Sequence, residues 1–328
     1  MELLNVLVIS KQIGGTFVLN GVSFSQKKLR KIAIAGETGS GKSTLLRIIG
    51  GLVQPDAGEV LFENVRIKGP AEKLIPGHPA IAYLSQQFEL ANNYRVEEVL
   101  SYANKLSEED AFKIFEVCQI DHLLKRRTDQ VSGGEKQRIA VARLLISSPR
   151  LLLLDEPYSN LDMVHKNILR TVIDDIGKRL DITCMLVSHD PIDILSWADE
   201  IIVLKDGQTI QKGPPENIYR QPINEYVAGL FGRYNLVDYG LAEMFHSLPG
   251  IQKNDGQLFI RPEDFKIVDK TNKLLEGTIT RIIFSGSHYE IEIQLPGSMI
   301  TVKTGDSDFR NGDTVYVSVD AKRVWYME

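Results

Sequence analysis

Apolar and polar residues alternate along the start of the chain, and this alternation predicts β-structure. Between residues 3 and 26 the alternation has a period of about two, which is typical of short antiparallel strands. Ile32–Ala35 is apolar throughout and ends at Gly36, as expected for a parallel strand buried on both faces. A helix is predicted from residue 43 to about 49, where two glycines stop it.

Helical and strand patterns then alternate through the middle of the chain. Residues 58–67 predict an edge strand, and the stretch from about 88 to 148 is mostly helical. Apolar runs at 151–155, 183–187 and 201–204 predict further buried strands. Strands that alternate with helices favour an α/β fold with a mostly parallel sheet, an antiparallel β-subdomain and an inserted helical subdomain.

The last part of the chain changes to a period of two. In residues 289–295 the apolar side chains fall on one face, and the pattern returns at 315–319 after the turn pair Asn311-Gly312. We therefore expect two domains: residues 1–235 form the α/β domain, and residues 236–328 form a small all-β domain.

Composition and charge narrow the class of protein. The 328 residues suit about two domains. The net charge of −5 gives no indication of nucleic-acid binding. The chain lacks a spanning apolar run and a basic, cleavable N-terminal segment, so we expect a cytoplasmic protein. Cys118 and Cys184 match no metal or redox spacing and are expected to be reduced, buried thiols.

A glycine-rich segment between the first buried strand and the first helix fits the phosphate-loop pattern of P-loop NTPases. Glycines let successive N–H groups point at phosphate oxygens, and the helix start adds its positive dipole end. A glycine-rich turn with a stray lysine is the plain alternative, but the flanking strand and helix favour phosphate binding. The expected ATP-binding residues are Gly36, Glu37, Thr38, Gly39, Ser40, Gly41, Lys42, Ser43 and Thr44.

Two carboxylates follow the four leucines at 151–154. Alone, such a pair is usually a solvated strand end; beside a phosphate loop it predicts the second half of a nucleotide site. Asp155, with Ser43, is expected to hold Mg²⁺, while Glu156 is expected to polarise the attacking water. Lys42 is expected to reach the β- and γ-phosphates.

Residues 131–138, Val-Ser-Gly-Gly-Glu-Lys-Gln-Arg, resemble the signature sequence of ABC-type ATPases. A serine and two glycines at a helix start form a second anion site, although a Gly-Gly helix cap is the plain alternative. The resemblance implies that Ser132, Gly133 and Gly134 hold the γ-phosphate of ATP bound to a partner copy. The chain is therefore expected to work as a homodimer.

Other positions match the same family. Gln86 resembles the glutamine that senses Mg²⁺ and the attacking water and links to the membrane subunits. The segment 159–162 resembles the loop that crosses the dimer contact, which gives Asp162 a role at the nucleotide. His189, in Ser-His-Asp, resembles the histidine that contacts the γ-phosphate. A lone histidine is more often structural, but its position after a strand favours function.

The tail segments 259–264 and 277–281 resemble the OB-like TOBE domain of importer ATPases. That group serves sugars, polyamines, ferric iron, sulfate and related oxyanions. The resemblance implies integral membrane permease subunits as partners, a solute-binding protein as an indirect partner, and a place on the inner face of the cell membrane. An ABC exporter ATPase and a non-transport ABC ATPase are the alternatives.

Three departures from the family pattern affect particular expectations. The aromatic residue that stacks on adenine in the family aligns with Ile13 or a neighbour, with Phe17 as a substitute candidate, so base contacts are open. Glu135 stands where most members have glutamine. Residues 90–95 differ from those of close relatives in the region that docks membrane subunits, which suggests a divergent partner.

Overall fold

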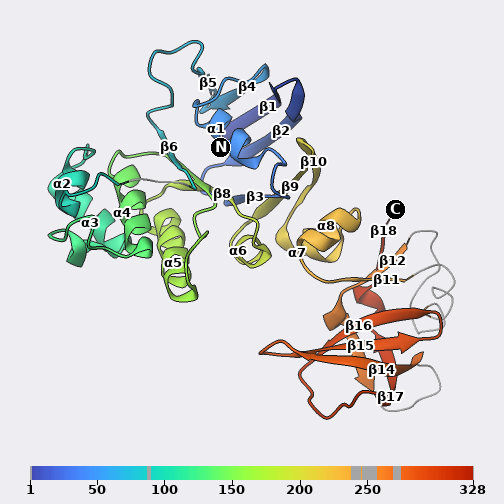
Figure 1. Cartoon of the computed structure of the whole chain (residues 1–328). Coiled ribbons are helices and arrows are strands. Elements are labelled where there is room, and N and C mark those ends of the chain that lie inside the picture. Colours follow the sequence, from blue (N-terminus) through green and yellow to red (C-terminus); the bar gives the residue numbers. More distant parts are fainter. Residues whose placement is uncertain (1, 87–89, 238–244, 246–256, 269–274, 328) are drawn as a thin grey trace. The chain divides into compact units, whose positions relative to one another are not determined.

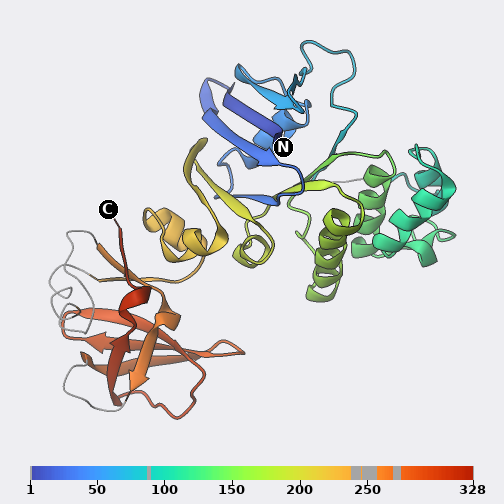
Figure 2. The same ribbon diagram turned by 180° about the vertical axis from the view of Figure 1, so that it is seen from behind.

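The computed structural model describes residues 2–86, 90–237, 245, 257–268 and 275–327. The chain divides into two compact units, residues 1–215 and 216–328, which are drawn in Figure 1 and, from behind, in Figure 2. This division falls before the domain boundary expected at residue 235. The two units are described separately.

The N-terminal unit begins with an antiparallel sheet in the order β2-β1-β4-β5. The strands predicted to be short are instead two 12-residue strands, β1 (Glu2–Ile13) and β2 (Thr16–Lys27). Several register shifts interrupt their pairing, and Val8 in β1 has a positive φ of 50°. Bulges of this kind bend and twist long strands, which explains why the sequence pattern predicts several short strands here.

The prediction of a single edge strand at 58–67 is wrong in one respect, because these residues form a hairpin of two strands. Strand β4 (Ala57–Phe62) pairs with the short strand β5 (Val65–Arg66). The turn between them has two residues with positive φ, Glu63 at 51° and Asn64 at 63°. Two positive φ values in succession define the tight turn whose twist matches antiparallel strands, and asparagine tolerates this conformation well.

The second sheet confirms the predicted parallel core. Its order is β10-β9-β3-β8-β7-β6, with parallel pairing throughout except for the antiparallel edge strand β10. Strands β6 and β10 had not been predicted. The strands are β3 (Ile32–Ala35), β6 (Ile81–Leu84), β7 (Leu151–Asp155), β8 (Thr183–Val187), β9 (Glu200–Lys205) and β10 (Gln208–Gly213).

Parallel pairing brings the ends of these strands to one edge of the sheet. The phosphate loop follows β3, Gln86 follows β6, Glu156 follows β7 and His189 follows β8. In open α/β sheets, ligands bind outside the carboxyl ends of the strands. The topology therefore gathers residues that are far apart in the sequence.

Helices of the N-terminal unit fall into two groups. Those near the parallel sheet are α1 (Lys42–Ile49), α5 (Met163–Arg179) and α6 (Pro191–Leu195). The predicted helical stretch holds α2 (Val96–Ser101), α3 (Glu108–Val117), a short 3-10 turn at Asp121–Leu123 and α4 (Gly133–Leu145), which lie together in both Figure 1 and Figure 2. Ser107 caps α3 by accepting a hydrogen bond from the Asp110 N–H at 3.1 Å. Among the described residues no helix is long and apolar enough to cross a membrane.

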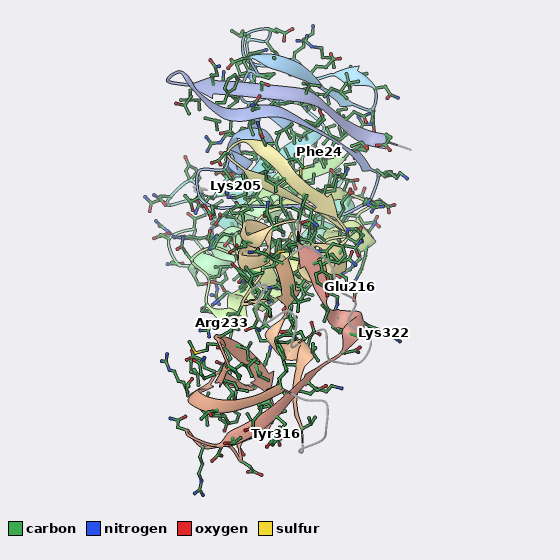
Figure 3. All side chains as sticks on the ribbon, turned by 90° about the vertical axis from the view of Figure 1, so that its right-hand side faces the viewer. Phe24, Lys205, Glu216, Arg233, Tyr316 and Lys322 are labelled. Atoms are coloured by element: carbon green, nitrogen blue, oxygen red, sulfur yellow. The ribbon has the colours of Figure 1, made fainter. Side chains whose placement is uncertain are left out.

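One apolar cluster of this unit is shared by α1 and both sheets. Leu45 and Leu46 of α1, Ile34 of β3 and Leu153 of β7 belong to it, and Phe24, labelled in Figure 3, packs there from β2. Burial of apolar side chains from three layers fixes the phosphate-loop helix against the strand that carries the carboxylates. Both cysteines are buried and form no disulfide, as predicted.

The C-terminal unit is mainly antiparallel β-structure. Its five-stranded sheet has the order β13-β17-β14-β15-β16, and a three-stranded sheet has the order β11-β12-β18. The predicted alternation is confirmed in β15, where Ile291, Ile293 and Leu295 are buried. Figure 3 labels Tyr316 of β17 and Lys322 of the 3-10 turn at Ala321–Arg323. The strands are β11 (Asn235–Val237), β12 (Gln257–Ile260), β13 (Phe265–Val268), β14 (Leu275–Phe284), β15 (Tyr289–Leu295), β16 (Ser298–Thr304), β17 (Thr314–Val319) and β18 (Trp325–Met327).

A buried arginine explains why two helices belong to this unit. Helix α7 (Pro215–Arg220) and helix α8 (Glu225–Leu230) precede its first strand. Arg261 is 1% exposed, and its guanidinium donates hydrogen bonds to main-chain carbonyls of the helical segment. These charge-assisted hydrogen bonds stabilise the buried positive charge. The acceptors are Tyr219, Ala228, Gly232 and Arg233.

Candidate active site

The phosphate loop has a backbone that only glycines allow. Gly36, Gly39 and Gly41 have φ values of 152°, 88° and 97°. A Cβ at Gly36 would lie 2.3 Å from the Leu204 carbonyl oxygen, and one at Gly41 would lie 2.4 Å from that of Val18. Glycine at these two positions therefore supplies both the left-handed turn and the close packing against β9 and β2.

Lys42 opens helix α1 and folds back over the loop. Its Nζ donates hydrogen bonds to the carbonyl oxygens of Gly36 at 2.8 Å and Glu37 at 2.6 Å. Burial lowers the pKa of Lys42 from its ordinary value, whereas the carboxylates of Glu156 and Asp155 act in the opposite direction. A cation held beside the N–H groups of a helix start attracts phosphate.

Ser43 and Asp155 meet between α1 and β7. The Ser43 hydroxyl donates to Asp155 Oδ1 at 2.9 Å, and the Tyr83 hydroxyl donates to Asp155 Oδ2 at 2.7 Å. Burial raises the pKa of Tyr83 to about 12, so its hydroxyl stays a neutral donor. The hydroxyl and carboxylate are hard oxygen donors of the kind that Mg²⁺ prefers, so these residues fit that ion.

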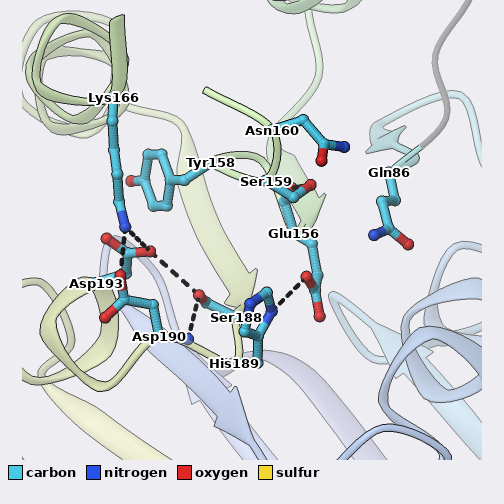
Figure 4. Close-up of a pocket in the computed structure, with 10 residues that line it drawn as sticks. All are labelled: Gln86, Glu156, Tyr158, Ser159, Asn160, Lys166, Ser188, His189, Asp190 and Asp193. Carbon is cyan, nitrogen blue, oxygen red and sulfur yellow. Dashed lines mark hydrogen bonds and ion pairs between the residues drawn. The ribbon is translucent and has the colours of Figure 1, made fainter. Parts of the chain in front are cut away.

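Glu156 and His189 form a close pair at the ends of β7 and β8. His189 Nδ1 lies 2.6 Å from Glu156 Oε2 (Figure 4). The Glu156 N–H donates to the Val187 carbonyl at 2.9 Å, which fixes the turn after β7. The His189 side chain is 64% exposed and that of Glu156 is 17% exposed, so the pair faces open space at the sheet edge.

Two adjoining cavities bring most of the predicted residues together. Gln86, Glu156 and His189 line both cavities. The larger, of about 400 Å³, is further lined by Val18, Thr38, Gly39, Gly41, Lys42, Ser43 and Thr44. The smaller, of about 290 Å³ and drawn in Figure 4, is further lined by Tyr158, Ser159, Asn160, Lys166, Ser188, Asp190 and Asp193.

The ABC-signature segment lies at the start of helix α4. Ser132 Oγ accepts a hydrogen bond from the Glu135 N–H at 3.2 Å, and Glu135 Oε2 accepts one from the Ser132 N–H at 2.7 Å. This reciprocal capping box satisfies two free N–H groups of the helix start. The hydrogen bond from the Ser132 backbone also lowers the pKa of Glu135. The capping hydrogen bond to Ser132 therefore gives a structural explanation for the glutamate at position 135.

Asp162, which is expected at the dimer contact, is connected to the same helix start through His165. Asp162 caps α5 by accepting a hydrogen bond from the His165 N–H at 3.0 Å, and its other oxygen lies 2.7 Å from His165 Nδ1. The His165 ring packs against Gly134. Ser132, Gly133, Gly134 and Asp162 are all described, but they line neither of the two cavities.

The sequence did not point to every residue of the site. Tyr83, Lys166 and Asp193 are ordinary residue types in no recognised motif, and their places follow only from the fold. Val18 lines the larger cavity, whereas Ile13 and Phe17, named for a possible contact with adenine, are 60% and 49% exposed. The residue that contacts the base stays a prediction. The neighbours of Gln86 at 87–89 lie outside the described residues.

Comparison with known proteins connects this geometry to a family. Residues 19–159 match a family model described as ABC transporter, and residues 258–327 match one described as TOBE domain. The spermidine/putrescine import ATP-binding protein PotA of Clostridium acetobutylicum is 32% identical, over 97% of this chain and 94% of its own length.

Two solved structures resemble the chain. The ADP conformation of MJ1267, an ATP-binding cassette of an ABC transporter, has a TM-score of 0.60 at 29% identity and covers 70% of this chain and 98% of its own. A dimeric post-hydrolysis state of the ATP-binding cassette MJ0796, bound to ADP and Pi, has a TM-score of 0.55 at 25% identity and covers 65% and 98%. The chain belongs to the ABC transporter ATPases, as an ATP-hydrolysing subunit of the import type with a C-terminal TOBE domain.

Proposed function

We propose that two copies of this chain close face to face on two ATP molecules and that closure drives transport by membrane permease subunits. The observation that carries the proposal is the placement of two phosphate-binding elements in one chain. The phosphate loop lines the larger cavity together with Glu156 and His189, whereas the helix start at residues 132–134 lines neither cavity. That second element is available to a nucleotide held by another copy.

The first copy holds its own nucleotide through the phosphate loop. Backbone N–H groups of the loop and Lys42 neutralise the β- and γ-phosphates, which requires Lys42 to exchange its loop carbonyl acceptors for phosphate oxygens. Ser43 and Asp155 would hold Mg²⁺, with Gln86 as a further oxygen donor facing the cavity. The ion, when bound, neutralises charge that develops on the phosphate oxygens.

Hydrolysis is assigned to the pair at the sheet edge. The Glu156 carboxylate polarises a water that attacks the γ-phosphorus, the bond from that phosphorus to the bridging oxygen breaks, and the products are ADP and inorganic phosphate. Glu156 accepts hydrogen bonding from the water, and His189, 2.6 Å away, orients this carboxylate and contacts the γ-phosphate. Both side chains line the cavity that contains Lys42.

The partner copy completes each site. Ser132, Gly133 and Gly134 would hold the γ-phosphate across the dimer, with Asp162 in the adjoining loop. The likeness to the dimeric cassette MJ0796 supports this assembly. ATP would contact both copies only in the closed dimer, so ATP binds the closed state more tightly than the open state and shifts the population toward it. Hydrolysis of ATP removes that preference.

The helical part offers a surface for the permease subunits. Ala91, Tyr94, Val99, Tyr102, Ala103 and Arg143 line an open, mainly apolar cavity of about 400 Å³. It includes part of the segment 90–95, which the resemblance assigns to permease docking. We propose that permease contact places the chain on the inner face of the cell membrane, with a solute-binding protein as an indirect partner. Because the PotA relative is named for spermidine and putrescine import, polyamines are the solute class to test first.

One variant tests the core of the proposal. Glu156→Gln keeps the shape of the side chain but removes the carboxylate base. It should bind ATP in the presence of Mg²⁺, stop turnover and accumulate as a dimer, measured by phosphate release and light scattering. Normal hydrolysis would contradict the role of Glu156, whereas a strictly monomeric ATP-bound form at high concentration would contradict the shared site.

A further inference from the structure

An ion-pair network lies directly behind His189, in the wall of the smaller cavity. Helix α5 contributes Lys166 and Arg170, which lie one turn apart on the same face. Helix α6 is capped by Asp190, which immediately follows His189, and it contributes Asp193. Figure 4 shows Lys166, Asp190 and Asp193 converging on the side of the cavity where Ser188 and His189 leave strand β8.

Asp193 is the centre of this network. Its side chain is 1% exposed and is paired with both basic residues. Lys166 Nζ lies 3.0 Å from Asp193 Oδ2, and Arg170 donates from Nε to Oδ1 at 3.0 Å and also from Nη2. A carboxylate this deeply buried needs such partners, and removing them leaves an uncompensated charge.

The same network fixes the backbone on both sides of His189. Ser188 Oγ donates to Asp193 Oδ2 at 3.3 Å and accepts from the Asp190 N–H at 3.1 Å. The Asp190 carboxylate pairs with Lys166 and accepts from the Ile192 N–H at 3.0 Å, which caps α6. The residues on both sides of His189 are therefore linked to helix α5, Asp190 directly through Lys166 and Ser188 through Asp193.

His189 itself has little other support. Its side chain is 64% exposed, and its Nδ1 lies within hydrogen-bond distance of Glu156, its proposed partner in the reaction. The direction of the imidazole therefore depends on the backbone between Ser188 and Asp190. Reactive groups need placement within about 0.5 Å, and a displacement of about 1 Å can lower a rate on the order of 100-fold.

We infer that Asp193, held by Lys166 and Arg170, is a positioning residue that aims His189 at Glu156 and the γ-phosphate. The inference rests on the proposed role of His189 in hydrolysis. It adds that helix α5, which is capped by Asp162 of the proposed dimer loop, carries the basic groups that hold Asp193.

The test is a double-mutant cycle on ATP hydrolysis by the full chain. Asp193→Asn should lower kcat by about 10- to 100-fold and leave the KM for ATP within about twofold, because the phosphate loop is untouched. In a His189→Ala background the same change should lower kcat by no more than about twofold, since a group that acts through His189 has nothing left to orient. An equal loss in both backgrounds would overturn the inference.

A second pair of variants covers the case in which Asp193→Asn fails to fold. Lys166 is less buried than Asp193, because its side chain is 13% exposed. Lys166→Met can therefore take the place of Asp193→Asn in the same double-mutant cycle. Lys166→Arg, which keeps the charge and can donate to two carboxylates, should recover most of the lost kcat. Failure of arginine to recover more activity than methionine would contradict the ion-pair explanation.

The matched control removes another ion pair on the same helix. Asp175 and Arg179 of α5 pair at 3.7 Å on the surface, and Asp175→Asn should leave kcat unchanged because exposed pairs contribute little. A loss equal to that of Asp193→Asn would show that any charge change in α5 has this effect and would overturn the inference. Normal turnover by His189→Ala alone would instead refute the proposed role of His189, and the inference with it.

Discussion

Neighbouring glycines at the start of helix α4 should respond in opposite ways to added side chains. A Cβ at Gly134 would lie 2.4 Å from Cδ2 and 2.7 Å from Cγ of the His165 ring, closer than real Cβ atoms come. A Cβ at Gly133 would have no atom within 4 Å. Gly134→Ala therefore tests packing inside one subunit, whereas Gly133→Leu changes only the surface that we assign to the partner's nucleotide.

The expected stabilities follow from these distances. Overpacking against His165 should cost Gly134→Ala about 1–3 kcal/mol of unfolding free energy. Gly133→Leu should instead gain up to about 0.8 kcal/mol from helix propensity, because leucine loses less backbone freedom than glycine. For a domain of this size about 1 kcal/mol corresponds to roughly 2–4 °C in Tm. In thermal unfolding, the Tm of Gly133→Leu should therefore equal or exceed that of the parent, and the Tm of Gly134→Ala should be clearly lower.

The functional assay is ATP-driven dimerisation in the Glu156→Gln background, followed by light scattering. Gly133→Leu should bind ATP in the monomer, since the phosphate loop is unchanged, yet remain monomeric because the leucine side chain occupies the space needed by the γ-phosphate. Ser132→Asp offers a charge-based companion, because aspartate keeps the N-cap but repels phosphate, and Ser132→Asn is its uncharged control. Dimerisation of Gly133→Leu at the parent's ATP concentration would refute the partner site.

Three further outcomes test the site and the division of the chain. Tyr83→Phe should lower the unfolding free energy by about 1–3 kcal/mol, because it removes a hydrogen bond from the buried Asp155 carboxylate. Denaturant unfolding measures this loss of stability, and an unchanged denaturation midpoint would contradict the prediction. Because burial lowers the pKa of Lys42, ATP affinity should fall as pH rises through that lowered pKa. Below the ordinary pKa of lysine the folded state binds fewer protons than the unfolded state, so this lysine's contribution to folding stability should rise with pH over the same window. Nucleotide titration and unfolding measured over a pH series below that ordinary pKa can check both trends. A chain ending at residue 215 should fold and stay soluble, whereas one ending at 235 should aggregate more, because it keeps α7 and α8 without Arg261; equal light scattering from the two would contradict the division at 215.

Local motifs made much of the site predictable. The phosphate loop depends on glycines at fixed spacing, and its φ values of 152°, 88° and 97° at Gly36, Gly39 and Gly41 explain why the pattern is so restrictive. Uniformly apolar runs predicted the parallel strands, and parallel pairing then places their ends at one sheet edge. The meeting of Lys42 with Glu156 and His189 in one cavity agrees with that expectation, whereas their chemical roles stay predictions.

Long-range contacts between ordinary residues could not be predicted. Tyr83 belongs to a strand that the pattern did not reveal, and its hydrogen bond to Asp155 joins positions far apart in the sequence. The position of Arg261 likewise depends on carbonyls of a helical segment that the loss of helical period assigned to the other domain. Such contacts leave no local periodicity, because each depends on the final arrangement of the elements.

The turn after strand β7 explains how consecutive carboxylates serve one site. Successive side chains of a strand point to opposite faces, so Asp155 and Glu156 could not both face the phosphate loop if the strand continued. Glu156 has a φ of 50°, which breaks the alternation: Asp155 turns to Ser43, and Glu156 turns to His189 and the cavity. Glycine would adopt this φ without the cost of order 1 kcal/mol that other residues bear, but it has no carboxylate. Strain at this position is therefore the expected consequence of placing the proposed base directly beside the proposed metal ligand.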